Sequence, residues 1–212
     1  MKKIAITLSI TAMAACAFAQ GTVNFNNVPS QLINTNGLAN GGTRGATAAG
    51  AAGTFYYGLF IAPVGQTIGG VADLFSGPWT FTGTYGTNTA AAGRLSGGPG
   101  TGVPVTGWAG GTSADYVLAG WSANLGHDWA QVMPLVQGGP GSYSPSQFFG
   151  ASLIGEGISG GGPLGQPVLA LFGAAAPNIQ GFDLMAGVPE PTTFVLGGLG
   201  VASLLIFRRR RA

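Results

Sequence analysis

The residues best suited to catalysis in this sequence are His127 and Asp128, which are adjacent in a chain that contains one histidine and many serines. A hydrolase of the Ser-His-Asp type needs its imidazole between the hydroxyl and the carboxylate. Adjacent residues of a strand point to opposite faces, which works against such an alignment. We therefore interpret His127 as a solvated turn residue and keep a secreted hydrolase as a less favoured alternative.

The acidic residues of the central region are isolated from one another, so they do not have the spacing of a calcium loop. They are Asp73, Asp115, Asp128, Glu156 and Asp183. Two of them could act as the acid and base of a glycosidase only if the fold brings them within roughly 5 to 10 Å. The glycine-rich residues 155–160 lack the Lys-Ser/Thr that follows a nucleotide-binding loop. We predict no catalytic residue, no metal site and no cofactor.

Tryptophan side chains offer a different chemistry, because exposed indole faces can stack on sugar rings. Trp108 and Trp129 fall in segments that we expect to be loops, and both are candidates for glycan stacking, whereas Trp79 and Trp121 are assigned to the core. These two candidates support an alternative function as a carbohydrate-binding module for extracellular polysaccharide. The interpretation that we favour is that Trp108 and Trp129 are merely partly exposed loop residues.

The charge of the central region argues against a function in nucleic-acid binding. The whole chain carries a net charge of +2, but residues 20–187 hold two arginines, Arg44 and Arg94, against five acidic residues, a net charge of −3. Binding to a nucleic acid requires clustered Lys and Arg that neutralise phosphates. Two isolated arginines do not supply that surface, so the sequence argues against a nucleic-acid partner.

The last residues of the chain, 188–212, combine three features in a fixed order. An apolar run without charge, residues 192–207, is preceded by the motif Val188, Pro189, Glu190 and Pro191. It is followed by the basic cluster Arg208, Arg209, Arg210 and Arg211. As a helix the run would rise about 24 Å, somewhat less than the roughly 30 Å of a hydrocarbon core. Arginines favour the cytoplasmic side, so we predict a short transmembrane helix with a basic membrane stop.

This order of features resembles the PEP-CTERM sorting signal of Gram-negative bacteria, whose members are substrates of membrane proteases called exosortases. The resemblance covers residues 188–212 and includes the motif, the apolar run and the basic cluster. It implies that an exosortase recognises the tail in the inner membrane, cleaves near residues 188–191 and passes the rest of the chain to the cell surface or to extracellular polysaccharide. The alternative is a permanent single-span anchor, which would not need the Pro-Glu-Pro sequence.

The first residues, 1–19, have the pattern of a secretory signal peptide, with two lysines, an apolar stretch and small residues before the expected cleavage site. Ala17 and Ala19 occupy the two positions that signal peptidase reads, so Gln20 is the expected mature N-terminus. This predicts the Sec translocon and signal peptidase as partners. Cys16 is the only cysteine and lies within this segment, which leaves a lipoprotein site as a minor alternative and a mature body without disulfides.

The body, residues 20–187, has 37 of the 40 glycines and few charges, which favours strands and turns over long helices. The apolar residues 55–61 predict a buried central strand. Further strands are predicted at residues 20–27, 79–85, 116–125 and 179–185. We therefore predict a mainly β fold, an antiparallel β-sandwich of immunoglobulin-like or jelly-roll type with Gly-rich loops, flanked by the N-terminal signal helix and the C-terminal transmembrane helix.

Two of these strands carry specific expectations about their faces. In residues 79–85 the aromatic side chains should point inward and the threonines to water, with a bulge at Gly83. In residues 116–125 the side chains of Val117, Ala119, Trp121 and Ala123 should share one face. Taken together, the sequence indicates an exported, non-catalytic surface or matrix protein that is held transiently in the inner membrane with its body in the periplasm, and then released to the cell surface or secreted.

Overall fold

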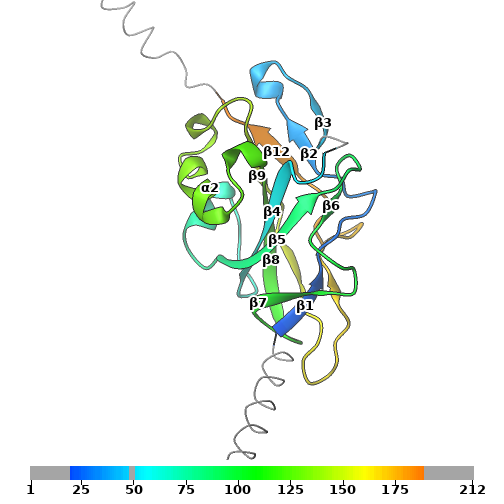
Figure 1. Ribbon diagram of the computed structural model, residues 1–212. Coiled ribbons are helices and arrows are strands. Elements are labelled where there is room, and N and C mark those ends of the chain that lie inside the picture. Colours follow the sequence, from blue (N-terminus) through cyan, green and yellow to red (C-terminus); the bar gives the residue numbers. More distant parts are fainter. Residues whose placement is uncertain (1–19, 48–50, 189–212) are drawn as a thin grey trace, which may run out of the picture.

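The computed structural model describes residues 20–47 and 51–188 and has a mainly β fold with few helices (Figure 1). A curled nine-stranded sheet forms the centre, and a three-stranded sheet packs on one of its faces in a sandwich-like arrangement. No helix within these ranges is long and apolar enough to cross a membrane. The predicted signal helix, residues 1–19, and the predicted transmembrane helix, residues 192–207, lie outside the described residues.

The nine-stranded sheet is built around β4, the strand that the apolar run predicted. In sheet order it contains β3 (Arg44–Ala46), β2 (Asn34–Asn36), β12 (Asp183–Ala186), β9 (Phe148–Ala151), β8 (Ser113–Ser122), β4 (Phe55–Ala62), β5 (Thr80–Asn88) and β6 (Leu95–Ser96). The ninth strand, β10 (Gly155–Ile158), pairs with β8 beyond the end of β9. β4 pairs along its whole length with β8 and is buried at almost every position, which confirms the prediction of a central strand.

Side chains on the two faces of β4 and β8 enter two separate cores, as the period of two of a strand requires. Tyr57 and Leu59 belong to the core beneath the small sheet, whereas Phe60 belongs to the core on the opposite face. On β8, Val117, Ala119 and Trp121 share that opposite face, as predicted. Ala123, the fourth residue assigned to this face, instead lies in η3 (Ala123–Leu125) after the strand has ended.

The small sheet has the order β11 (Leu169–Ala170), β1 (Gln20–Asn24) and β7 (Val103–Ala109). β1 confirms the strand predicted at the start of the body. Its pairing with β11 is parallel, as is that of β12 with β2, so the prediction of a purely antiparallel sandwich is corrected to a mixed one. A three-stranded sheet on a nine-stranded one also differs from the two sheets of comparable size in immunoglobulin-like and jelly-roll sandwiches.

A short helical layer covers the other face of the large sheet and was not predicted. It contains α2 (Trp129–Val136), η2 (Val71–Phe75) and η4 (Pro140–Ser142). Another short turn, η1 (Leu38–Asn40), connects β2 to β3. Trp129, Val132 and Val136 are the buried residues of α2 and lie on the face that packs against the sheet. Their spacing is that of an amphipathic helix, but the helix has only eight residues and contains Pro134.

The bulge predicted at Gly83 is present in β5. The register between β4 and β5 shifts at this point, and Gly83 adopts a φ of +76°. The prediction that the threonines of this strand face water is wrong for Thr82 and Thr84, which are buried. The hydroxyl of Thr82 donates a hydrogen bond to the carbonyl oxygen of Leu59 at 2.9 Å, at the point on β4 where the regular pairing is interrupted.

Candidate functional site at the C-terminal junction

The body ends in β12, a strand that lies in the interior of the large sheet although it is the last in the chain. β12 pairs in parallel with β2 through residues 183–185 and antiparallel with β9 through Met185 and Ala186. The sequence predicted a strand at residues 179–185, so the element is confirmed with shifted bounds. Because it has a neighbour on both edges, β12 holds residues 187 and 188 at a fixed place on the body.

Two further residues continue the ordered chain beyond β12 and are attached to the body by backbone hydrogen bonds. The N–H of Gly187 donates to the carbonyl oxygen of Gln147 at 3.0 Å, and the N–H of Val188 donates to that of Pro140 at 2.7 Å. The side-chain amide of Asn40 donates to the carbonyl oxygen of Gly187. We call residues 186–188 with these partners the junction. It fixes the first residue of the sequence motif Val188, Pro189, Glu190 and Pro191 against the body.

Gly187 is buried so tightly in the junction that no other residue fits. A Cβ atom at this position would lie 2.0 Å from the carbonyl oxygen of Tyr143 and 2.5 Å from that of Ser144, both in a backbone segment with no flexible end to move aside. The close approach of two backbones explains why glycine stands here. No local pattern in the sequence distinguishes Gly187, because only the contact with the distant residues 143–144 sets it apart.

The carboxylate of Asp183 ties the start of β12 to the outer strands β2 and β3. It accepts hydrogen bonds from Nε of Arg44 at 2.6 Å and from Nη2 of the same side chain at 2.8 Å, and from the amides of Asn34 and Asn36 at 3.2 Å each. Hydrogen bonding to the Arg44 guanidinium holds the pKa of Asp183 below its ordinary value. Arg44 and Asp183 are 139 residues apart, so no local pattern in the sequence reveals this pair.

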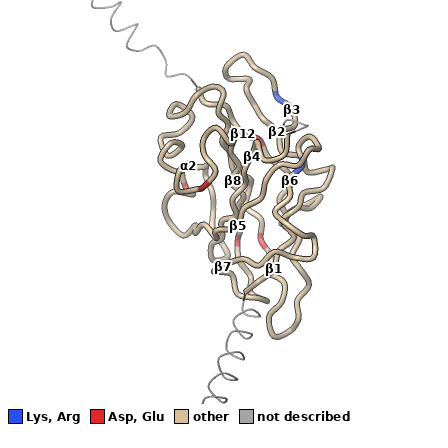
Figure 2. Tube along the Cα trace, viewed as in Figure 1, with Lys and Arg blue, Asp and Glu red and all other residues tan. Residues whose placement is uncertain are grey.

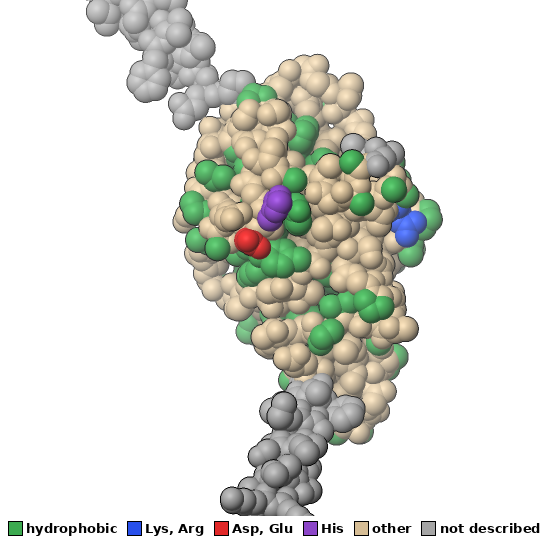
Figure 3. Space-filling model, in the orientation of Figure 1, with side chains coloured by type: hydrophobic (Ala, Val, Ile, Leu, Met, Phe, Trp, Pro, Cys, Tyr) green, Lys and Arg blue, Asp and Glu red, His purple; other side chains and the backbone are tan. Residues whose placement is uncertain are grey.

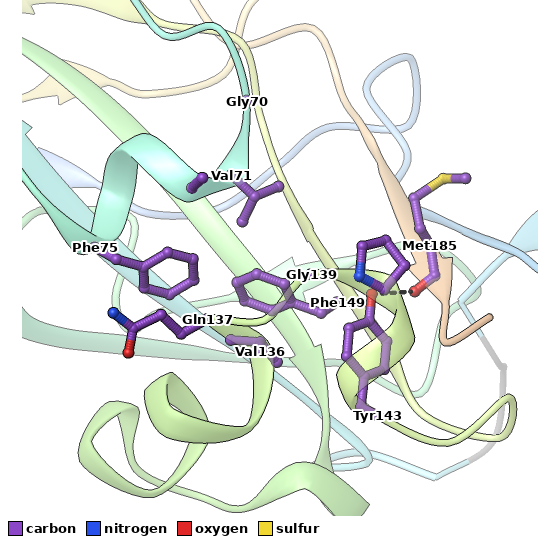
Figure 4. Close-up of a pocket in the computed structure, with 11 residues that line it drawn as sticks. Gly70, Val71, Phe75, Val136, Gln137, Gly139, Tyr143, Phe149 and Met185 are labelled. Atoms are coloured by element: carbon purple, nitrogen blue, oxygen red, sulfur yellow. Dashed lines mark hydrogen bonds between the residues drawn. The ribbon is translucent and has the colours of Figure 1, made fainter. Parts of the chain in front are cut away.

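An apolar pocket with a volume of about 260 Å³ opens beside the junction (Figure 4). Its wall contains the rings of Phe75, Phe149 and Tyr143 together with the side chains of Val136 and Met185. The hydroxyl of Tyr143 donates to the backbone carbonyl of Met185 at 3.3 Å, and burial raises the pKa of Tyr143 to about 12, so the hydroxyl stays a neutral donor. None of the residues that line the pocket is charged.

His127 and Asp128 lie on the surface, at the start of α2, where Figure 3 shows the single imidazole in purple. The ring of His127 stacks on Tyr56 with 4.9 Å between ring centroids. The backbone N–H of His127 donates to the side-chain carbonyl of Gln131 at 3.1 Å, and Asp128 is the N-cap residue of α2. These contacts give both residues a role in starting α2. A hydrogen bond that would align the imidazole with Asp128 is not found.

One Gly-x-Ser-x-Gly pattern, of the kind that exposes a nucleophile in hydrolases, occurs at residues 157–161. Its Ser159 is fully buried, and its hydroxyl donates to the carbonyl oxygen of Ala109 at 2.7 Å. The preceding Ile158 pairs with Ser113 at the first residue of β8, whereas His127 follows the last residue of that strand. The serine and the histidine therefore lie at opposite ends of β8.

The expectation that Trp108 and Trp129 present free indole faces is corrected by their burial. Trp108 is 2% exposed and donates its Nε1–H to the carbonyl oxygen of Thr112 at 2.9 Å. Trp129 is 8% exposed and is stacked on Phe75 at 5.7 Å and on Phe149 at 6.3 Å between centroids. Both indoles are core residues, because Trp108 lies in β7 of the small sheet and Trp129 lies in α2 of the helical layer, and each packs into the core between its layer and the large sheet.

Asp115 and Glu156 are directly opposite partners in the antiparallel pairing of β8 with β10, so the fold brings these two acidic residues together on one face of the sheet. The other three lie on separate elements, Asp73 in η2, Asp128 at the start of α2 and Asp183 in β12 (Figure 2). Asp73 accepts the N–H of Gly69 beside its own turn, and Asp115 accepts the N–H of Gln66, so both stabilise local backbone. Within residues 20–47 and 51–188, no group of three or more His, Cys, Asp or Glu side chains is arranged to hold a metal ion.

The other predicted site residues fall outside the described ranges. They are the signal-peptidase residues Ala17 and Ala19, the motif residues Pro189, Glu190 and Pro191, and the basic stop Arg208, Arg209, Arg210 and Arg211.

Comparison with known proteins identifies one family model in the chain. The model of the PEP-CTERM protein-sorting motif matches residues 187–211. The match begins at Gly187, the residue that the fold holds most tightly at the junction. No curated protein and no solved structure matches the chain.

Proposed function

Since the chain ends in a PEP-CTERM protein-sorting motif, we propose that it is an exported, non-catalytic cell-surface or extracellular-matrix protein whose body is delivered by an exosortase that cleaves near residues 188–191. In this proposal the protein is the substrate, and the catalytic groups of the cleavage belong to the protease. The Sec translocon and signal peptidase act before it at Ala17 and Ala19, and the inner membrane holds the tail during the transit.

The observation that carries the proposal is the position of the sorting motif relative to the fold. The hydrogen-bonded structure of the body extends through Val188, and the sorting motif covers residues 187–211. β12 is complete at Ala186 and is paired on both edges. Cleavage after Val188 would therefore leave in place every strand and core residue of the part of the chain that the structure describes, which is the property that a detachable sorting signal requires.

The non-catalytic role is supported by the way in which the polar residues of the body are used. His127 stacks on Tyr56, Asp128 caps α2, and Ser159 is buried against Ala109. Each of these groups has a structural partner that accounts for its presence. The fold then serves as a stable, faintly acidic unit that is displayed outside the cell.

The proposal is tested by replacing Pro189, Glu190 and Pro191 together with alanine in the native cell and measuring the intact mass of the protein in membrane and extracellular fractions. The wild type should begin near Gln20, end near the motif and be found outside the cell. The variant should accumulate in the membrane with its C-terminal arginines still attached.

A matched control replaces Pro163 and Leu164, two exposed residues of a loop in the body, with alanine. This control should be processed like the wild type, because the change lies away from the motif. Normal release of the motif variant would refute the sorting function. A wild-type chain that retains Arg208 to Arg211 in the membrane would establish a permanent anchor instead.

A further inference from the structure

The surface that surrounds the junction has the properties of a membrane-contacting face. Leu38, Leu135 and Met185 are exposed by 60%, 44% and 40% respectively. All three lie on elements that hold the junction: η1 is attached through Asn40, α2 leads into η4 with its Pro140, and Met185 belongs to β12. We call these three residues, together with the apolar pocket between them and η2, the junction surface.

The junction surface has almost no charge. Residues 129–155, which contain α2, η4 and β9, include no Asp, Glu, Lys, Arg or His. The charges on the surrounding elements are few: Asp73 in η2 accepts the N–H of Gly69 at 2.6 Å, and Asp128 caps the far end of α2 from Leu135. Arg44 and Asp183 neutralise each other in an ion pair of 2.6 Å. On the face shown in Figure 3, the end of the body above α2 shows no charged side chain. Such a surface could approach lipid without the large free-energy cost of desolvating a charge.

The length of the chain beyond the structure determines what this surface meets. Val188 is the last residue that the structure describes, and the predicted apolar run begins at Thr192, so the linking segment spans at most about 14 Å when fully extended. The polar headgroup layer on one side of a bilayer takes up about 5 to 7 Å of that length. The junction surface is thus held within a few ångströms of the lipid whenever the tail is inserted.

From this geometry we propose that the junction surface docks on the phospholipid bilayer that anchors the tail, with Leu38, Leu135 and Met185 in contact with the interfacial acyl chains. The inference rests on the proposed function, because it requires an inserted tail. The tether makes the contact intramolecular, so a surface too small to bind membranes by itself binds at a high effective concentration. After cleavage of the tail this advantage disappears and the body is released.

The surface lacks the basic residues by which many peripheral proteins recognise anionic lipids. The docking is therefore expected to be independent of lipid charge and of salt. The body of residues 20–188 alone should not bind vesicles detectably, whereas the chain with its tail should dock equally on vesicles of phosphatidylcholine alone and on vesicles that also contain phosphatidylglycerol.

The test uses residues 20–212 in liposomes, a chain without cysteine, with single labelling sites at Leu38→Cys and Met185→Cys. Leu164→Cys is the matched control, because Leu164 is 86% exposed and its loop is paired to the start of β1, at the other end of the body from β12 (Figure 1). An environment-sensitive dye at residues 38 and 185 should shift to shorter wavelength and be quenched by phospholipids brominated in their acyl chains. The dye at residue 164 should do neither.

A second set of variants tests whether the dye itself, rather than the surface, causes the wavelength shift. Leu135→Asp should abolish the wavelength shift of the dye at residue 38, and Leu164→Asp should leave it unchanged. Both positions are exposed, so neither change disturbs the core.

The outcomes separate this inference from the proposed function. If alkaline carbonate does not extract the chain but the dyes at residues 38 and 185 behave like the one at 164, the docking is refuted and the sorting function stands. If carbonate extracts the chain, the anchored tail and the docking both fail. A shift that occurs only when exosortase is present in the liposomes would assign the surface to the protease and overturn its assignment to lipid.

Discussion

Val188 donates its backbone N–H to the carbonyl oxygen of Pro140 at 2.7 Å, and this bond attaches the start of the sequence motif to the body. Pro140 opens η4, which follows the helix α2 and lines the apolar pocket. The first residue of the Val-Pro-Glu-Pro motif is therefore part of the fold, while the residues that follow belong to the tail. This division leads to predictions about which residues the body requires for its stability.

Truncation of the tail should leave the body as stable as before. A chain of residues 20–188 should unfold cooperatively in urea at the same midpoint as the chain that retains its tail in detergent, since all twelve strands are present. A chain of residues 20–182 lacks β12, which separates β2 from β9, and should not fold. Near-ultraviolet circular dichroism of the buried tryptophans distinguishes the two results.

An intermediate truncation provides the control for this series. A chain of residues 20–186 keeps β12 but loses three hydrogen bonds of the junction, each worth about 0.5 to 1.5 kcal/mol. It should fold with a lower urea midpoint. Equal midpoints for the chains that end at 186 and 188 would show that residues 187 and 188 are not held by the body.

Gly187→Ala should lower the free energy of unfolding by about 1 to 3 kcal/mol, as overpacking of a tight site does. The added methyl group would lie 2.0 Å from the carbonyl oxygen of Tyr143. Gly45→Ala on the outer strand β3 is the matched control, because its Cβ would meet no atom within 4 Å. Urea denaturation of both variants tests the prediction, and equal stabilities would contradict it.

Asp183→Asn should remove a component of stability that depends on pH. The folded-state pKa of Asp183 is lowered from its ordinary 3.8, so its contribution is complete above that value and is lost as the pH falls through the lower folded pKa. The wild type should therefore be more stable than the variant at pH 7, and the difference should shrink in strong acid. Urea midpoints measured between pH 7 and pH 2 give the comparison, and a difference that stays constant would rule out this linkage.

Thr82→Val should destabilise the body by about 1 to 3 kcal/mol, because it leaves the buried carbonyl of Leu59 without its side-chain donor at the bulge. Thr80→Val, an exposed position on the same strand, serves as the control and should change little. Thermal unfolding of the two variants measures the difference. If the Thr82 variant melts like the control, then the hydroxyl does not satisfy the bulge.

The sequence predicted the parts of the fold that depend on local pattern. The apolar run of residues 55–61 identified the central strand because both of its faces are buried, and the alternation around Trp121 identified the inner face of β8. α2 was missed although Trp129, Val132 and Val136 have helical spacing, because a proline lies within the segment. The parallel pairings of β1 with β11 and β12 with β2 join distant residues, so no local signal indicates them.

For the candidate site, the sequence motif was predictable, whereas the junction that holds it was not. The motif at residues 188–191 and the arginines at the C-terminus are contiguous, and their order alone identified the sorting segment that the family model matches. The junction depends on Asn40, Pro140 and Gln147, which only the fold brings to residues 187 and 188. The burial of Trp108 and Trp129 likewise depends on the packing of β7 and α2 against the large sheet, which no local pattern indicates.

The position of β12 also sets the order in which an exported body can form. Its partner β2 begins at Asn34, near the start of the body, and is joined to β12 through Asn34 and Asp183, which are 149 residues apart. A chain that crosses the membrane from its N-terminus delivers β12 last, immediately before the apolar run. In the proposed export route, the large sheet therefore closes only when translocation of the body is nearly finished.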